Sequence, residues 1–373
     1  MSKKILICNI GTEIGGIEKC LINFLKYLET KECEVDLVLW KPNGPLYDQI
    51  PSFVNIIDSP GPGSFSKIKK EKNLLKLFFR LYKYVKFKTF AKFSVPWKSL
   101  RKNKKHYDIA ISYCQNGYSP YYIIDNVNAK DKYLWYHELN YLCDKKKKKF
   151  DEKYFSRFSN IICVSDACRV NLTTAFPTLS EKFITLYNFY DIEEIKQKAE
   201  LESNPYNYPH KNVIATVGRL SKEKGVTLAI DTCNELLKYR DDFVWCWIGD
   251  GPEKAFAESK IKEYGLEEHL VLMGNKTNPY IYMKNCDLYV QPSLSEAYCT
   301  TIIEAMILRK NIVCTNVDSV YEQVIDGKNA LISQIDYLKL CDRIIESFNY
   351  SYDVSESYIK LNNRGNYDLM FFD

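Results

Sequence analysis

Hydrophobic and polar positions along the first half of the chain predict short buried strands that are separated by amphipathic helices. Near-continuous apolar runs of this kind are typical of strands that are covered on both faces of a parallel sheet. Residues 15–31 have a helical period that places four apolar side chains on one face, namely Leu21, Phe24, Leu25 and Leu28. The predicted strands of this half are 3–10, 34–40, 108–114, 132–137 and 160–165.

The second half repeats the pattern, with predicted helices at 226–239, 253–264 and 300–308. Its predicted strands are 212–219, 242–251, 269–274, 287–293 and 311–315. Strands that alternate with helices predict an α/β fold of two Rossmann-like, doubly wound domains facing a cleft. We expect a first domain over 1–190 and a second over 191–349, with a linker around 190–211. The last helical pattern, about 350–373, is expected to join the first domain.

Composition and cysteine spacing limit the kind of protein that this chain can be. Its 373 residues are 46% hydrophobic and 27% charged, which indicates folded globular domains. The thirteen cysteines include no CxxC pair, so we expect neither a disulfide framework nor a metal site. No apolar stretch reaches the ~18 residues that would cross a bilayer. We therefore expect a cytoplasmic protein, either soluble or attached to the inner face of the membrane.

Two glutamates, Glu296 and Glu304, lie around the junction between a predicted strand and a predicted helix. Such a junction directs backbone N–H groups toward an anion, and carboxylates accept hydrogen bonds from hydroxyl groups. A nucleotide sugar, which carries both phosphate and hydroxyls, suits this combination. Glutamates are common in helices, so the interpretation depends on this setting and on the motifs upstream.

One upstream motif is the loop 218–225, GRLSKEKG, which follows the first strand of the second half. Arg219 at the end of that strand and Lys224 at the start of the next helix would form a phosphate clamp with the helix N-terminus. The alternative is a charged loop without a ligand.

Three further loops hold candidate residues. Gly15 and Gly16 follow the first strand and permit a close backbone approach, although they do not form a dinucleotide-binding GxGxxG motif. His137 ends a predicted strand, where it would contact a sugar hydroxyl or the reacting carbon, or would be a structural histidine. Gly249 begins the turn GDGPE, which lies near a nucleotide base or is only a turn.

Residues 67–105 contain fifteen Lys or Arg and one acidic residue, a net charge of +14 in a chain whose total is +5. Five apolar residues recur within this segment at helical spacing: Leu74, Leu77, Phe78, Leu81 and Val85. The pattern predicts a basic amphipathic helix, and its apolar side either packs on the domain or meets an anionic membrane surface. Nucleic acid is the other polyanion, but the chain contains no recognition module for it, so we expect no nucleic-acid partner.

Taken together, these motifs resemble the retaining family 4 glycosyltransferases of the GT-B fold, also described as glycosyl transferases group 1. The resemblance is strong over 213–332, recognisable over 3–41 and 132–188, and thin over 42–105. It implies an acceptor-binding first domain and a donor-binding second domain.

The resemblance also assigns roles to residues. Arg219 and Lys224 would bind the donor diphosphate, Glu304 the ribose hydroxyls and Glu296 the donor sugar, with His137 near the sugar. It thus implies Glu296, His137, Arg219 and Lys224 as the catalytic set. The other implied donor-site positions are Gly15, Gly16, Gly218, Gly249, Ala297, Tyr298, Cys299, Thr300 and Thr301.

By the same resemblance, the expected reaction transfers a sugar from a UDP- or GDP-sugar to a glycan or lipid-linked acceptor, with retention of configuration. No cofactor or metal is expected, because Arg219, Lys224 and a helix N-terminus would meet the charge of the leaving diphosphate. The chain departs from the family at Ala297, Tyr298 and Cys299, where Gly-aromatic-Gly or Gly-aromatic-Pro is usual. It departs again at 317–324, VDSVYEQV, where the family often has paired glycines.

Two other functions remain open from the sequence. The first is a sugar-nucleotide epimerase on the same fold, which the glutamate spacing and the loop 218–225 disfavour. The second is a non-catalytic protein that binds a membrane or another polyanion through its basic segment. The presence of Arg219, Lys224, Glu296 and Glu304 together disfavours that second function.

Overall fold

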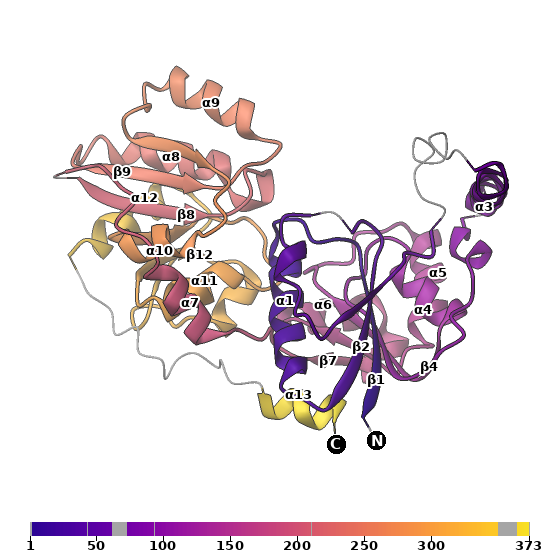
Figure 1. The fold of residues 1–373 in the computed structure, drawn as a ribbon. Coiled ribbons are helices and arrows are strands. Elements are labelled where there is room, and N and C mark those ends of the chain that lie inside the picture. Colours follow the sequence, from indigo (N-terminus) through magenta and orange to yellow (C-terminus); the bar gives the residue numbers. More distant parts are fainter. Residues whose placement is uncertain are drawn as a thin grey trace. The chain divides into compact units, whose positions relative to one another are not determined.

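A computed structural model describes residues 2–42, 44–61, 73–92, 94–209, 211–349 and 364–372. The chain divides into two compact units, and each unit is built around one parallel sheet with helices (Figure 1). The first unit comprises Met1–Val164, Cys168–Phe189 and Asn363–Asp373, and the second comprises Ser165–Ala167 and Tyr190–Asn362. The expected α/β fold with two doubly wound parallel sheets is thus confirmed.

The sheet of the first unit has seven strands in the order β3-β2-β1-β4-β5-β6-β7, and all neighbours are parallel. The strand order reverses between β1 and β4, which makes this the switch point where open α/β sheets bind ligands. The strands are β1 (Lys3–Asn9), β2 (Cys33–Leu39), β3 (Asn55–Ile57), β4 (His106–Ser112), β5 (Asn128–Tyr136), β6 (Asn160–Cys163) and β7 (Phe183–Thr185). The helices are α1 (Gly16–Glu29), α3 (Leu74–Lys92), α4 (Ser119–Asn126), α5 (Lys145–Phe155), most of α6 (Asp166–Ala175) and α13 (Arg364–Phe371).

Helix α1 packs on the sheet through the face that its sequence period predicts. Leu21, Phe24, Leu25 and Leu28 are all buried. The helix buries these side chains in the core because residues three and four positions apart share one side of it.

The C-terminal helix α13 completes the core of the first unit. Tyr367 is buried and its ring centroid lies 5.7 Å from that of Phe24, while its hydroxyl donates a hydrogen bond to the carbonyl of Tyr187 at 2.9 Å. Phe371 is also buried, and its ring lies 6.2 Å from Trp135. Helix α13 therefore lies beside the start of β1, which places both ends of the chain in the first unit (Figure 1).

The second unit has six strands in the order β10-β9-β8-β11-β12-β13, and all neighbours are parallel. Its switch point lies between β8 and β11. The strands are β8 (Asn212–Val217), β9 (Phe243–Ile248), β10 (Leu270–Gly274), β11 (Leu288–Gln291), β12 (Asn311–Thr315) and β13 (Leu331–Ser333). The helices are α7 (Ile192–Ala199), α8 (Val226–Leu236), α9 (Lys254–Glu263), α10 (Tyr280–Asn285), α11 (Thr300–Ile307) and α12 (Tyr337–Ser347).

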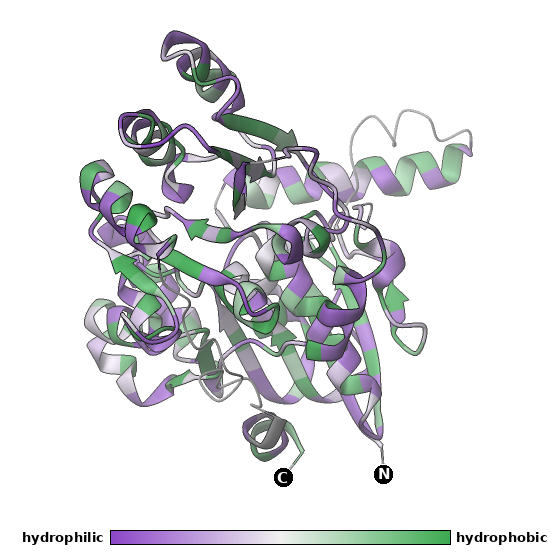
Figure 2. Ribbon diagram, turned by 90° about the vertical axis from the view of Figure 1, so that its left-hand side faces the viewer, coloured by the Kyte–Doolittle hydropathy of each residue, from purple (hydrophilic) through white to green (hydrophobic). Residues whose placement is uncertain are grey.

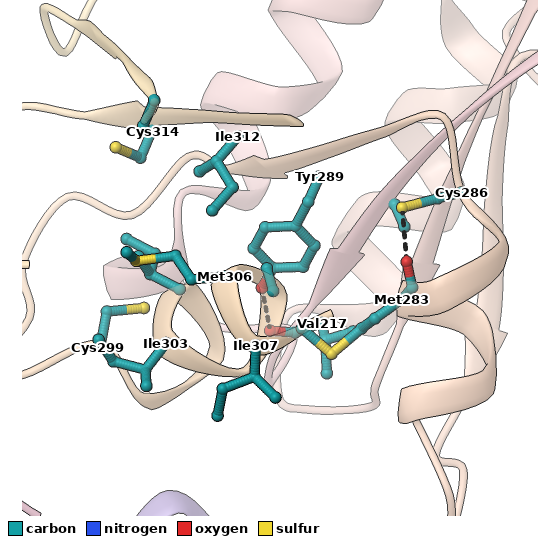
Figure 3. Close-up of a cluster of buried hydrophobic side chains, with 14 of the residues drawn as sticks. Val217, Met283, Cys286, Tyr289, Cys299, Ile303, Met306, Ile307, Ile312 and Cys314 are labelled. Atoms are coloured by element: carbon teal, nitrogen blue, oxygen red, sulfur yellow. Dashed lines mark hydrogen bonds between the residues drawn. The ribbon is translucent and has the colours of Figure 1, made fainter. Parts of the chain in front are cut away.

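The packing of α11 on its sheet fixes the position of the turn between β11 and α11, which carries Glu296. Ile303 and Met306 of α11 are buried with Tyr289 of β11 and Ile312 of β12 in one apolar cluster (Figure 3). Because α11 is fixed in this way, the turn between β11 and α11 is anchored at both ends.

The structure also corrects parts of the sequence interpretation. The segment expected to be a linker, 190–211, contains helix α7, which Asp191 caps by accepting a hydrogen bond from the backbone N–H of Glu194. Strand β5 ends at Tyr136, one residue before His137. Strands β3, β7 and β13, each of three residues, were not predicted. Of the basic segment 67–105, residues 67–72 and 93 lie outside the described residues.

Candidate functional site

The loops that follow β8 and β11 meet at the switch point of the second sheet. Strand β8 pairs with β9 on one side and with β11 on the other, so the carboxyl ends of β8 and β11 are neighbours. Gly225, which precedes α8, adopts a left-handed conformation with φ of 76°, and a Cβ there would collide with the carbonyl oxygen of Pro292 after β11. Only glycine permits this contact between the two loops.

This contact places Lys224 beside the second loop. The Lys224 Nζ atom lies 2.5 Å from Oε1 of Glu296, whose side chain is buried. Burial is the largest single influence on the pKa of Lys224 and lowers it, but Glu296, Cys299 and Glu223 together raise it by more. The pKa of Lys224 therefore lies above its usual value. Lys224 therefore stays protonated and donates a charge-assisted hydrogen bond to Glu296.

A chain of buried hydrogen bonds reaches the same carboxylate oxygen of Glu296 and orients it. Ser293 donates its hydroxyl to Glu296 Oε1 at 2.7 Å, and Gln291 donates Nε2–H to the Ser293 hydroxyl at 2.8 Å. The Oε1 atom of Gln291 accepts hydrogen bonds from Tyr289 at 2.7 Å and from Thr301 at 2.9 Å. The sequence analysis missed Gln291 and Ser293, although the first is a polar residue at the end of an otherwise apolar strand and the second follows it by two positions.

The turn after Glu296 is held by the segment 317–324. Gln323 and the peptide of Cys299 form two reciprocal hydrogen bonds, of 3.1 Å and 2.8 Å, and Ser319 donates to the carbonyl of Glu296 at 2.9 Å. Burial raises the pKa of Cys299 to about 12, with Glu296 as a further cause, so the residue remains a thiol. Its sulfur packs in the cluster of Figure 3. The segment that departs from the family pattern thus supplies side chains that fix this turn.

Glu304 lies in α11 and is buried. Its Oε1 atom accepts a hydrogen bond of 3.1 Å from the hydroxyl of Tyr280, the first residue of α10. Tyr280 was not predicted, because it lies 24 residues from Glu304 in the chain and no motif connects the two.

Arg219 occupies a different setting from Lys224. Its guanidinium is exposed, and Nη2 lies 2.6 Å from Oε1 of Glu223 in the same loop. The structure therefore gives each cation of the predicted clamp a carboxylate partner. The pair between Arg219 and Glu223 is solvent-exposed, so a phosphate can replace the carboxylate at low cost.

The two other predicted glycines of the second unit, Gly218 and Gly249, hold adjacent loops together. A Cβ on Gly249, whose φ is 149°, would lie 1.9 Å from the carbonyl oxygen of Gly218. That same oxygen accepts a hydrogen bond from Trp247 Nε1 at 2.9 Å. Gly218 and Gly249 therefore fix the loops after β8 and β9, and the other predicted positions, Ala297, Tyr298, Thr300 and Thr301, line the turn and first turn of α11.

In the first unit, Gly15 precedes α1 and Gly16 is its first residue. The Glu18 carboxylate lies over this helix start, only 2.5 Å from where a Cβ of Gly15 would be. Burial raises the pKa of Glu18. An acidic side chain, and not a cationic one, therefore covers the helix start that the resemblance implies as part of the donor site.

His137 is half-buried, and its ring forms a hydrogen bond of 2.9 Å through Nε2 with the carbonyl of Tyr113. A carbonyl only accepts, so Nε2 carries the proton and Nδ1 carries the lone pair. Burial lowers the pKa of His137 to about 4, which keeps the ring neutral. This geometry gives the Nε2 side of His137 a structural partner.

Two features are absent from the part of the chain that the structure describes, a metal-binding cluster and a membrane-spanning helix. No group of three or more His, Cys, Asp or Glu side chains there is arranged to hold a metal ion. No helix in the same residues is both long and apolar enough to span a bilayer.

Curated relatives match less than half of this chain. An N-acetylgalactosaminyltransferase of Campylobacter jejuni that acts on N-acetylgalactosamine-N,N'-diacetylbacillosaminyl-diphospho-undecaprenol is 32% identical over 167 residues, 44% of each chain. Alpha-D-kanosaminyltransferase of Streptomyces kanamyceticus is 28% identical over 146 residues, 39% of this chain and 38% of that protein. The chain thus spans less than half the length of these curated relatives.

Solved structures match over nearly the whole chain. HepE of Anabaena in complex with UDP and glucose has a TM-score of 0.67 at 20% identity, with 100% of this chain and 96% of that chain covered. A variant of Staphylococcus aureus TarM in complex with UDP has a TM-score of 0.68 at 16% identity, with 98% and 96% covered. These similarities establish the fold, which is that of the GT-B glycosyltransferases.

The family model described as Glycosyl transferases group 1 matches residues 197–351, which include every candidate residue of the second unit. The resemblance that the motifs indicate is therefore confirmed for this region. Residues 197–351 are thus similar to the glycosyl transferases group 1 family, as the motifs of the second unit indicate.

Proposed function

We propose that this protein is a retaining glycosyltransferase that moves a sugar from a nucleoside-diphosphate sugar to a glycan or lipid-linked acceptor. The observation that carries the proposal is the ion pair of Lys224 and Glu296 at the switch point of the second sheet. A cation and a carboxylate held side by side at this edge suit a ligand with a phosphate next to sugar hydroxyls.

The donor would contact three groups in the second unit. Arg219, Lys224 and the backbone N–H groups at the start of α11 would bind the diphosphate. Glu304, held by Tyr280, would accept hydrogen bonds from the ribose hydroxyls. Glu296, held by Ser293, would contact the donor sugar.

Catalysis would then depend on stabilising the departing diphosphate. The bond from the anomeric carbon to the phosphate oxygen breaks, and the acceptor oxygen forms its bond on the same face of the sugar. The acceptor's proton passes to the departing phosphate. Lys224 and Arg219 stabilise the charge that develops on that phosphate, and Glu296 lies nearest to a sugar whose ring becomes oxocarbenium-like. We propose that no divalent ion is required.

The first unit would bind the acceptor, and the chain would act on the cytoplasmic side in the synthesis of a surface polysaccharide or glycoconjugate. Two of the relatives support this assignment, since one acts on a diphospho-undecaprenol carrier and TarM was solved with a GlcNAc-glycerol ligand. Attachment to the membrane surface is a separate proposal and is treated in the next subsection.

A thermal-unfolding panel tests the donor assignment. UDP, GDP and ADP, and then their glucose, galactose and N-acetylhexosamine conjugates, are added to the full chain, and one nucleotide should raise Tm because it binds only the folded state. No shift with any of these compounds would contradict the proposal.

Two assays on the selected donor test the reaction. Release of the nucleoside diphosphate with and without acceptor separates transfer from epimerisation, because an epimerase returns an isomeric nucleotide sugar without an acceptor. The anomeric configuration of the product, read by NMR, tests retention. Activity should survive EDTA, and abolition that Mg²⁺ or Mn²⁺ restores would contradict the metal-independent proposal.

A further inference from the structure

Helix α3 is an apolar and basic helix that the first unit leaves uncovered. None of its nineteen residues, Leu74–Lys92, is buried. Figure 2 shows green and purple residues alternating along it. Large apolar side chains normally leave water when a helix packs on its domain, so this exposure requires a reason outside the described fold.

The exposed apolar residues gather on one side of α3. Seven of them are at least one-third exposed: Leu74, Leu75, Phe78, Phe79, Leu81, Tyr82 and Val85. Within this set, positions 74, 78, 81 and 85 follow the helical repeat and share one face. The half-buried residues of α3 are Leu77, Tyr84, Lys86, Phe87, Phe90 and Ala91. Among them Leu77, Tyr84 and Ala91, spaced by seven residues, define a different face. The apolar side of α3 therefore points away from the side on which the helix approaches its unit.

The C-terminal part of α3 is attached to the first unit through aromatic rings. Phe87 lies 5.8 Å from Tyr118 between ring centroids, and Trp97 lies 6.1 Å from the same Tyr118. Trp97 also lies 5.9 Å from Phe150 of α5. These contacts form a continuous path of side chains from α3 to α5, so the basic residues of both helices belong to one region of the first unit.

The charge of this region has one sign. Over 73–105, eleven Lys or Arg residues occur without any acidic residue. Helix α5 begins with five consecutive lysines, of which Lys147 pairs with Asp151 and Lys148 lies over the ring of Phe176. The other three, Lys145, Lys146 and Lys149, are exposed.

We propose that α3 binds in the interface of an anionic lipid membrane, with its exposed apolar face among the acyl chains and its lysines at the headgroups. Apolar insertion with flanking cations is the physical pattern of interfacial helices, and each base near an anionic leaflet adds to the attraction. A second copy of the chain would bring a like charge to this face. Nucleic acid would meet the cations but would leave the aliphatic side chains in water. The exposed lysines of α5 extend the same contact.

Co-sedimentation of the full chain with vesicles tests the proposal without any measure of catalysis, so its failure is separate from failure of the proposed reaction. Binding to phosphatidylcholine–phosphatidylglycerol vesicles should exceed binding to phosphatidylcholine alone, and it should weaken as salt rises because ions screen the attraction. Equal binding to both vesicles, or no binding to the anionic ones at low salt, would overturn the proposal.

Two double variants, each with a matched control, separate the contribution of charge to vesicle binding from that of apolar insertion. Lys83→Glu with Lys88→Glu should lower binding at least tenfold, whereas the charge-matched exposed pair Lys262→Glu with Lys328→Glu in the second unit should not. Phe78→Ser with Phe79→Ser should remove the part of the binding that resists salt, whereas the exposed pair Leu201→Ser with Tyr239→Ser should retain it. Circular dichroism and Tm should match the unmodified chain in all four.

Further measurements distinguish the membrane from the two other possible partners of α3, a second copy of the chain and a nucleic acid. A concentration-dependent dimer in sedimentation velocity that Phe78→Ser with Phe79→Ser dissociates would assign the face to a second copy and overturn the proposal. Tighter binding to single-stranded RNA than to anionic vesicles at equal ionic strength would also overturn it. Tryptophan fluorescence of a Phe79→Trp variant should shift to the blue on anionic vesicles, and an unshifted spectrum in a pelleted complex would contradict insertion.

Discussion

Gly225 approaches Pro292 so closely that a Cβ on Gly225 would lie 1.8 Å from the carbonyl oxygen of Pro292. This contact joins the two loops that carry Lys224 and Glu296. The site therefore depends on a residue that has no side chain to offer a ligand.

The first prediction concerns that glycine. Gly225→Ala should lower the free energy of unfolding by more than the ~1–2 kcal/mol that a left-handed conformation costs a non-glycine residue, because the backbone must also move. Gly265→Ala is the matched control, since Gly265 has a similar φ of 67° with open space around it. Urea unfolding of both variants measures the difference. Equal losses would show that the Pro292 contact is not tight.

The second prediction concerns the two carboxylates. Glu304→Gln should weaken binding of the free nucleoside diphosphate, because the amide is a poorer acceptor for two ribose hydroxyls. Glu296→Gln should lower kcat more than nucleotide affinity, since its proposed partner is the sugar. A hydrogen bond to a charged group contributes about 1.5–3 kcal/mol, so each effect should be roughly tenfold or more. Calorimetric titration with the diphosphate decides the matter, and equal losses of affinity would refute the division of roles.

The third prediction concerns the cations. Arg219→Ala and Lys224→Ala should each weaken donor binding by about 1.5–3 kcal/mol and lower turnover. Glu223→Gln should strengthen nucleotide binding, because it releases Arg219 from its carboxylate partner. Donor affinity by fluorescence competition measures all three. Wild-type kinetics in both alanine variants would mean that the two residues do not bind the diphosphate.

The fourth prediction concerns the support of Glu296. Ser293→Ala removes the hydroxyl between Gln291 and Glu296, which leaves buried polar atoms short of partners at a cost of about 1–3 kcal/mol. The variant should lower kcat with a small change in KM. Ser347→Ala is the matched control, since Ser347 is buried and donates to the carbonyl of Ile344 in α12. If Ser293→Ala leaves kcat unchanged and lowers only stability, the hydrogen bonds from Gln291 through Ser293 to Glu296 have a structural role alone.

The fifth prediction concerns pH. Burial lowers the pKa of His137 to about 4, while the unfolded value is near 6.5. The unfolded chain therefore takes up the proton first, and the contribution of His137 to stability is present above pH ~6.5 and is lost as the pH falls toward 4. The Tm difference between the unmodified chain and His137→Gln should shift accordingly between pH 7.5 and 4.5. A Tm difference that is constant over this range would contradict the neutral, half-buried ring.

The sequence predicted what depends on local pattern and missed what depends on distant pairs. The buried face of α1 was predictable, because Leu21, Phe24, Leu25 and Leu28 follow the helical period. The loops of Lys224 and Glu296 were predictable as neighbours from the expected sheet, but the ion pair between them was not.

Other features left no local signal. Gln323 and Cys299 lie 24 residues apart, and a glutamine in a turn has no distinguishing pattern. Strand β7 has only three residues, too few for a period. Helix α7 was mistaken for linker because the Pro- and Tyr-rich residues that follow it outweighed its Asp191 cap. The exposure of α3 could not be predicted either, because an apolar face gives the same sequence pattern whether it packs on the domain or is exposed to solvent.

The position of α13 has a consequence for the synthesis of the protein. The first unit buries Tyr367 and Phe371 against rings that the ribosome made more than two hundred residues earlier, Phe24 and Trp135. The second unit is therefore translated in full before the first unit has helix α13, which completes its core. A nascent chain that is stalled before residue 364 leaves Phe24 and Trp135 without these partners, and the core of the first unit closes only when α13 has emerged from the ribosome.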